Sequence, residues 1–141
     1  MNTILLDRLI ENACIDIKKP FIWDNNEVSI PEVKQYIEQG GKGNPKFYED
    51  VFMNQSKTIE PKEFHVARVA YFVQNPSEIQ GITIDNYCYG YTIYPQAVIL
   101  DGWHRLMAAC ILGMEKIKVN YSGRTDVLRY LQGIRRTPPT A

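Results

Sequence analysis

Apolar residues recur along the chain with two different periods, which together predict a mixture of helices and strands. Helical spacing, with apolar positions three and four residues apart, marks the segments 4–10, 30–39, 45–51, 61–74, 104–112 and 125–131. Alternation, or a short apolar run typical of buried strands, marks 14–17, 82–84, 97–100 and 116–121. The segment 86–94 carries four tyrosines around Gly90 and is typical of a hairpin or an ordered loop.

Local signals predict where several helices begin and end. Ser29-Ile30-Pro31-Glu32 has the form of a capping box with proline in the first turn, and Gly40-Gly41 can end that helix. Pro61 opens a further helix, which Asn75-Pro76 ends. Thr3 and Thr125 are candidate caps of the first and last helices, and Gly113 and Gly133 are candidate stops.

The order of these elements predicts an α/β (mixed α+β) fold, a single small domain in which helices flank a mixed sheet. The length of 141 residues suits one domain, expected over 1–136, with a helical N-terminal part at 1–60 and a disordered tail at 137–141. A parallel βαβ pairing of 97–100 with 116–121 is plausible, although a mixed sheet accommodates the hairpin better. On the helix at 104–112 we expect Leu106, Ala109 and Cys110 to face the sheet, with Val98 and Leu100 buried.

Composition narrows the classes of protein to consider. No apolar run approaches the ~20 residues that span a bilayer. Asp7, Arg8 and Glu11 interrupt the apolar start, so neither a signal peptide nor a membrane partner is expected, and the expected location is cytoplasmic. Three widely separated cysteines and two histidines make a zinc site hard to assemble, so reduced, mostly buried thiols are expected.

The charges balance overall but are distributed unevenly. The net charge of +0 argues against a broad surface for nucleic acid, and strong sequence-specific DNA binding by the chain alone is not expected. Residues 1–60 hold 7 basic and 10 acidic side chains, whereas residues 97–141 hold 7 basic and 3 acidic ones. The basic excess could focus an anionic ligand near the end of the chain, or it could be a solvated face.

The segment 100–113 combines features that favour anion binding. An apolar strand leads into an abrupt turn at Asp101-Gly102, and a helix begins directly afterwards. The first N–H groups of a helix have no partner within the helix, and its dipole is positive at that end. Gly102 allows close approach to the backbone, while His104 and Arg105 add side-chain donors, so the pattern predicts a phosphate or carboxylate site.

Each of these residues also has a plain structural interpretation. Asp101 is a good helix N-cap, and Gly102 could serve only the turn. Trp103 could be a packing residue. His104 could bond locally, and Arg105 could lie on the surface.

The stretch Asp101-Gly102-Trp103-His104-Arg105, continued by Leu106-Met107-Ala108-Ala109-Cys110-Ile111-Leu112-Gly113, resembles the loop motif of the ParB/sulfiredoxin-like superfamily. The helix around His65 and Arg68 is similar to the helix that precedes the sheet in small ParB-like domains. The resemblance covers the segment 61–121. It implies that this segment forms the core of the domain, as in the family.

Departures from the family motif narrow the activity that the resemblance implies. Sulfiredoxins carry their catalytic cysteine where Trp103 stands, so sulfinic-acid reduction is not expected. ParB partition proteins have two arginines in place of His104-Arg105, a second phosphate motif and a downstream DNA-reading domain. Neither the second phosphate motif nor the DNA-reading domain has a match after Val119, so a partition clamp is not expected.

Our first hypothesis is therefore a phosphate- or nucleotide-binding ParB-like domain from a bacterial, plasmid or phage system, with nucleotide hydrolase or nuclease activity left open. The candidate catalytic residues are Asp101, His104 and Arg105. His104 would act as a general acid/base or donate a hydrogen bond to the phosphate, and Arg105 would clamp the phosphate. Asp101 would orient His104 or hold a divalent metal. The candidate ligand-binding residues are Gly102, Trp103, Arg68 and His65, the last two by family analogy alone. No resident metal is assigned, and the cofactor stays open, with Mg²⁺ arriving alongside a nucleotide as one option.

The second hypothesis is a non-catalytic interaction protein of a mobile element, acting as an inhibitor or accessory factor that binds a host protein. The tyrosines at 87, 89, 91 and 94 favour it if they are exposed, because tyrosine is enriched at interfaces. Packing within strands is the alternative use of the same side chains.

Overall fold

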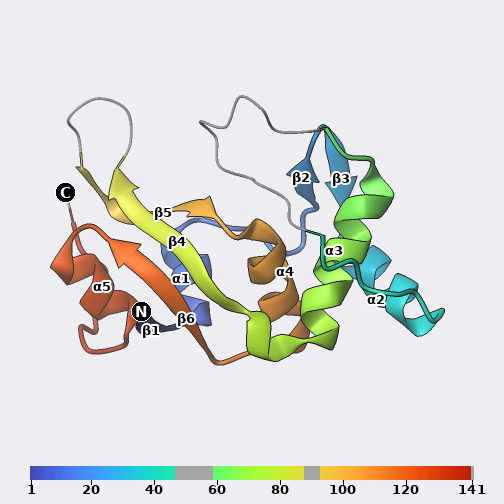
Figure 1. Cartoon of the computed structure of the whole chain (residues 1–141). Helices are drawn as coiled ribbons and strands as arrows, with labels where there is room; N and C mark the ends of the chain where they lie inside the picture. Colours follow the sequence, from blue (N-terminus) through green and yellow to red (C-terminus); the bar gives the residue numbers. More distant parts are fainter. Residues whose placement is uncertain (47–58, 88–92, 141) are drawn as a thin grey trace.

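The computed structural model describes residues 1–46, 59–87 and 93–140, and it shows a mixed α+β fold (Figure 1). The elements follow in the order β1 (Asn2–Leu5), α1 (Leu6–Asn12), β2 (Phe21–Trp23), β3 (Asn26–Val28), α2 (Ile30–Glu38), α3 (Lys62–Gln74), the 3₁₀ turn η1 (Pro76–Glu78), β4 (Gln80–Tyr87), β5 (Ile93–Asp101), α4 (Trp103–Leu112), β6 (Lys116–Ser122) and α5 (Thr125–Leu131). The fold class predicted from the sequence is confirmed.

The main sheet is mixed, with strand order β1-β6-β4-β5. Strand β4 is parallel to β6 and antiparallel to β5, while β1 is antiparallel to β6. Strands β5 and β6 therefore run in opposite directions with β4 between them, so the predicted parallel βαβ pairing was wrong. The predicted hairpin is confirmed in its described part, since Tyr87 pairs with Ile93 across β4 and β5.

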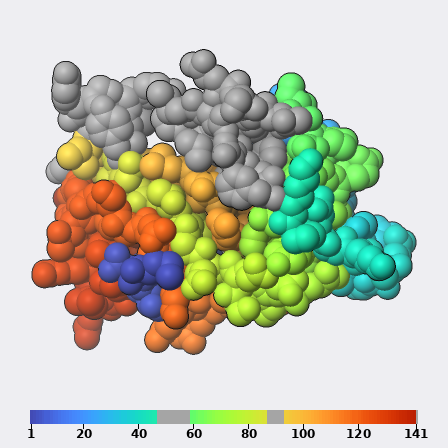
Figure 2. Space-filling view, viewed as in Figure 1, coloured from blue at the N-terminus to red at the C-terminus, as the bar shows by residue number. Residues whose placement is uncertain are grey.

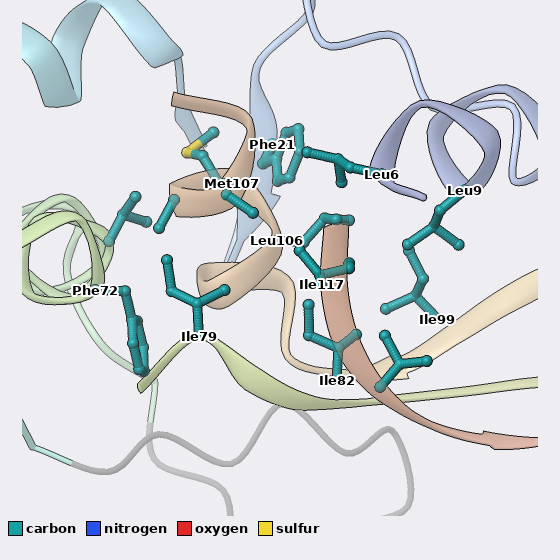
Figure 3. Packing of buried hydrophobic residues seen from close by; sticks show 14 of the residues in the cluster. Leu6, Leu9, Phe21, Phe72, Ile79, Ile82, Ile99, Leu106, Met107 and Ile117 are labelled. Atoms are coloured by element: carbon teal, nitrogen blue, oxygen red, sulfur yellow. The ribbon is translucent and has the colours of Figure 1, made fainter. Parts of the chain in front are cut away.

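One face of this sheet forms the core. Its buried side chains come from all four strands: Ile4, Ile82, Ile84, Ala97, Ile99, Ile117 and Val119. Leu106 of α4 lies over Ile117 and Ile82 (Figure 3). The alternate positions of β6, such as Lys116 and Lys118, are exposed, as expected for a sheet with one solvated face.

The predicted packing of α4 and β5 is half right. Leu106 and Ala109 are fully buried, and Cys110 packs against the core while partly exposed. Val98 and Leu100, however, are only half-buried, because Ala97 and Ile99 occupy the core face of β5. Side chains alternate along a strand, so a prediction shifted by one residue exchanges the two faces.

The local signals for helix ends gave mixed results. In α2 the Ser29 Oγ accepts from the Glu32 N–H and the Glu32 carboxylate accepts from the Ser29 N–H, which confirms the capping box. Helix α4 ends at Gly113 in the left-handed conformation, as predicted. Asp101 is not the N-cap of α4: that residue is Gly102, and Asp101 instead pairs with Thr83 at the end of β5. Thr125 is likewise the first helical residue, after Arg124 as N-cap.

The N-terminal part differs most from expectation. Residues 2–5 pair with β6 as strand β1, so the helix predicted from residue 4 with Thr3 as its cap begins at Leu6 instead. The predicted strand at 14–17 is a turn region. Residues 45 and 46 are irregular, and the rest of the predicted helix at 45–51 lies outside the described residues. At the other end, the segment predicted to be a disordered tail is described through Thr140, whose carbonyl accepts from Arg124 Nη2 at 2.8 Å.

The two ends of the chain lie side by side. In Figure 2 the N-terminal residues sit against the C-terminal helix region. Arg8 Nη1 donates to the carbonyls of Tyr130 and Arg135, and its guanidinium lies 4.3 Å from the centre of the Tyr130 ring.

Among the described helices none is long and apolar enough to cross a membrane.

The sequence reading missed the small hairpin β2–β3. Trp23 pairs with Asn26, so Asp24 and Asn25 form a two-residue turn. Both turn residues have positive φ, 51° and 62°, as a type I′ hairpin turn requires, and Asp and Asn tolerate this conformation better than most residues. The hairpin lies beside α3 and presents Trp23 and Asp24 to it (Figure 1).

Candidate functional site

The two histidines of the chain meet between helices α3 and α4. His65 Nδ1 lies 2.9 Å from His104 Nε2, a hydrogen-bond distance. His65 is fully buried and His104 is 4% exposed. Since the residues are 39 positions apart in sequence, only the packing of α3 on α4 brings the rings together.

A carboxylate completes the chain of hydrogen bonds. Asp24 Oδ2, at the tip of the β2–β3 hairpin, lies 3.0 Å from His65 Nε2. The same oxygen accepts a hydrogen bond of 2.9 Å from the backbone N–H of Glu60. The Asp24 side chain is 5% exposed, so carboxylate, His65 and His104 form one buried polar row.

The indole of Trp23 covers this row. Its ring lies nearly parallel to His104, with centroids 4.2 Å apart and an 11° angle between planes. The ring of His65 is 5.4 Å from the same indole at 8°. This stacking favours the observed orientation of the imidazole planes, most strongly for His104, whose ring is the closer of the two to the indole.

Two arginines converge on a neighbouring aromatic ring. The Cζ atoms of Arg68 and Arg105 lie 4.5 and 5.2 Å from the centre of the Phe72 ring, respectively. Arg68 Nη1 also donates to the Asn44 carbonyl at 3.3 Å. Arg105 Nε is buried and has no hydrogen-bond partner among the described residues, which leaves a charged group with unmet bonding capacity.

The structure thus places four of the predicted site residues on the two packed helices α3 and α4. His65 of α3 lies at hydrogen-bond distance from His104 of α4, while Arg68 of α3 and Arg105 of α4 each lie near the ring of Phe72. The family analogy suggested that His65 and Arg68 face the same cleft as the α4 motif; the structure places them on α3, which packs against α4.

The turn residues of the motif have other surroundings. Gly102 has φ +102°, and a Cβ there would lie 3.1 Å from an Ile82 side-chain atom, so both conformation and space favour glycine. Trp103 is half-buried and meets Phe21 edge-on at 5.6 Å. Asp101 pairs with Thr83 through the backbone, and its carboxylate makes no hydrogen bond or ion pair with the described residues; the carboxylate joined to the histidines is that of Asp24.

A cleft of about 630 Å³ adjoins the hairpin. Its aromatic walls are Phe21, Trp23 and Trp103, and its polar lining includes Asp24 and Lys19. Asp24 therefore connects the cleft with the buried histidines. Burial raises the pKa of the Cys110 thiol to about 11, which disfavours the nucleophilic thiolate at neutral pH.

The described residues include no group of three or more histidine, cysteine, aspartate or glutamate side chains that could hold a metal ion. Asp24, His65 and His104 are arranged in a row with their polar atoms bonded to one another, not around a common point. The geometry thus gives no support for metal at these residues, and the option of Mg²⁺ bound with a nucleotide stays a prediction.

The chain matches no protein-family model, no curated protein and no solved structure. The ParB/sulfiredoxin-like resemblance therefore rests on this sequence alone, chiefly on the motif at 101–113. The evidence for function is the geometry around the two histidines and the two arginines.

Sequence reasoning missed Asp24, Trp23 and Phe72. A usable signal existed for the turn, because Asp24-Asn25 lies between two short runs with apolar residues at alternate positions. No sequence signal places that turn against α3, since the contact depends on how the hairpin folds over the helices.

Proposed function

We propose that this protein binds a phosphoester, such as a nucleotide, and hydrolyses it by general acid–base chemistry. The observation that carries the proposal is the contact of His65 with His104 across α3 and α4, together with the approach of Arg68 and Arg105 to the ring of Phe72. Acid–base groups and cationic clamps thereby lie on the same two packed helices. The proposal keeps the cytoplasmic setting predicted from the sequence.

The arginine pair supplies the anion-binding part. Guanidinium groups recognise phosphate oxygens through a planar fork of donors, and stacking on an aromatic ring pre-organises that fork. Two like charges near one ring, that of Phe72, repel one another, so an anion bound by either guanidinium would lower the repulsion. The N–H group of Arg105 Nε has no acceptor in the part of the chain that the structure describes.

His104 is the candidate acid–base group, since it lies in the same helical turn as Arg105 and at the start of α4. A positioned imidazole contributes about 10²- to 10⁴-fold to hydrolytic reactions. Burial under Trp23 keeps water from competing for its hydrogen bonds.

The direct test of binding is thermal unfolding of the full chain with pyrophosphate, a nucleoside triphosphate or a short oligonucleotide, each with and without Mg²⁺. Selective binding to the folded state raises stability by RT ln(1 + [L]/Kd). We expect at least one phosphoester to raise the melting temperature and chloride at matched ionic strength not to. No shift with any of them would reject the proposal.

Hydrolysis is tested separately by following phosphate release or strand cleavage. We expect His104→Ala to lower the rate about 10²- to 10⁴-fold while binding persists. Binding without turnover in the wild type would retain the anion site and remove the enzymatic part.

An interaction protein is the second candidate, favoured by exposed apolar side chains on two hairpins. Ile22 of β2 is 66% exposed, and Ile93 and Tyr94 of β5 are 57% and 43% exposed. Tyr89 and Tyr91, which the sequence also offers for an interface, lie outside the described residues. Two results together would favour this candidate: no rise in melting temperature with any phosphoester, and tight binding to a host protein that the Ile93→Ser variant abolishes.

A further inference from the structure

We propose that Asp24 and His65 are positioning residues that hold His104 in the tautomer whose Nδ1 accepts a proton. The identity of the reaction rests on the proposed function above. The tautomer is a property of the folded chain and can be measured without any substrate.

The direction of the hydrogen bonds follows from the carboxylate. An ionised carboxylate can only accept, and two N–H groups converge on Asp24 Oδ2: the Glu60 backbone at 2.9 Å and His65 Nε2 at 3.0 Å. The backbone N–H cannot be anything but a donor. His65 Nε2 therefore carries hydrogen as well, because a proton on this oxygen would compete with the Glu60 N–H for the same space.

The assignment then passes along the row. A neutral His65 with hydrogen on Nε2 has a lone pair on Nδ1. His104 Nε2, 2.9 Å away, must donate to that lone pair, which leaves the lone pair of His104 on Nδ1. Asp24 thus determines the protonation pattern of a ring two hydrogen bonds away.

The same row can take up the proton that His104 removes. When Nδ1 of His104 gains a proton, its Nε2 proton can move across 2.9 Å to His65 Nδ1. The N–H bond on His104 Nε2 breaks, one forms on His65 Nδ1, and the positive charge comes to lie beside the Asp24 carboxylate. Asp24 stays ionised throughout, so no other group has to supply or remove charge.

Trp23 keeps the rings aligned for this transfer. Both imidazoles lie within 11° of the plane of the indole, and the two imidazole planes differ by 9°. His65 is fully buried, so water does not interrupt the row at its centre. Low local dielectric strengthens hydrogen bonds of this kind.

The test is nitrogen-15 NMR of the imidazole side chains in the full chain. The chain has 2 histidines, so His65→Asn and His104→Asn variants assign both rings. At about pH 8, well above the ordinary pKa of imidazole, we expect hydrogen on Nε2 and a bare Nδ1 in both rings of the wild type. Hydrogen on Nδ1 of His104 under these conditions would overturn the proposal.

Asp24→Asn then tests the positioning role. Asparagine accepts the positive φ of 51° at this turn, but its side chain is uncharged and can turn an N–H toward His65. We expect the Nε2–H pattern of His104 to be lost or mixed with the other tautomer. Asp16→Asn is the control, because Asp16 lines the same cleft but bonds to the Lys18 backbone, and it should leave both rings unchanged.

Activity separates this proposal from the proposed function. If the protein hydrolyses a phosphoester, Asp24→Asn should lower kcat about 10²-fold or more with little change in KM. If no hydrolysis is found but the tautomers are as stated, the proposed function fails and the positioning of His104 stands. Unchanged tautomers in Asp24→Asn would reject the positioning role whatever the activity.

Discussion

Gly102 occupies a backbone conformation that other residues adopt with strain. Its φ is +102°, and an added Cβ would lie 3.1 Å from an Ile82 side-chain atom. We expect Gly102→Ala to lower the free energy of unfolding by about 1–3 kcal/mol, the usual cost of such strain. Gly113→Ala is the matched control, since Gly113 has φ +64° with nothing within 4 Å, and it should cost less. Urea denaturation compares them, and equal losses would show that the contact with Ile82 is unimportant.

Cys110 should resist alkylation in the folded protein. Its pKa of about 11 leaves about 100-fold less thiolate at neutral pH than an ordinary cysteine has. Cys14 is exposed and should react readily. In a Cys88→Ser background, mass spectrometry after iodoacetamide treatment should find label on Cys14 alone until denaturant is added. Rapid labelling of Cys110 in the native state would contradict the packing of α4.

For single residues, the sequence indicated candidate site residues better than it indicated which side chains they would contact. His104 and Arg105 could be found because both lie in one short motif, and His65 and Arg68 by family analogy. Asp24 could not be found, because the bond from its carboxylate to His65 spans 41 positions and depends on the β2–β3 hairpin. Asp101 was chosen for its place in the motif, but the strand pairing with Thr83 holds it at the end of β5.

Helix α4 is held against the sheet and α3 by small and medium side chains. Ala108 and Ala109 are fully buried, so there is no space for a larger group. We expect Ala109→Phe to destabilise the protein by about 1–3 kcal/mol through overpacking. Leu112→Phe, on the same helix at a site 40% exposed, should change stability by no more than about 0.5 kcal/mol. Thermal melts would contradict this account if the two variants behaved alike.

Elements with strong local signals could be predicted from the sequence, and those defined by pairing could not. The capping box at Ser29 and the stop at Gly113 depend on neighbouring residues only, and both were right. Ile4 and Leu5 were predicted to be helical because their apolar spacing continues into α1, yet pairing with β6 makes them part of a strand. The same limit produced the incorrect βαβ unit, since the insertion of β4 between β5 and β6 has no local signature.

For the whole molecule, the central claim is that α3 and α4 together form a phosphate site. The decisive measurement is calorimetric titration of the full chain with pyrophosphate, comparing the wild type with Arg105→Ala, Arg105→Lys and the exposed control Arg129→Ala. A contact to a charged group is worth about 1.5–3 kcal/mol, so Arg105→Ala should weaken binding about 10- to 150-fold. Arg105→Lys should recover part of the loss, because it restores charge but not the fork. Arg129→Ala should bind as the wild type does. Unchanged binding by Arg105→Ala, alongside a large loss of thermal stability, would show that Arg105 is structural and would contradict the account.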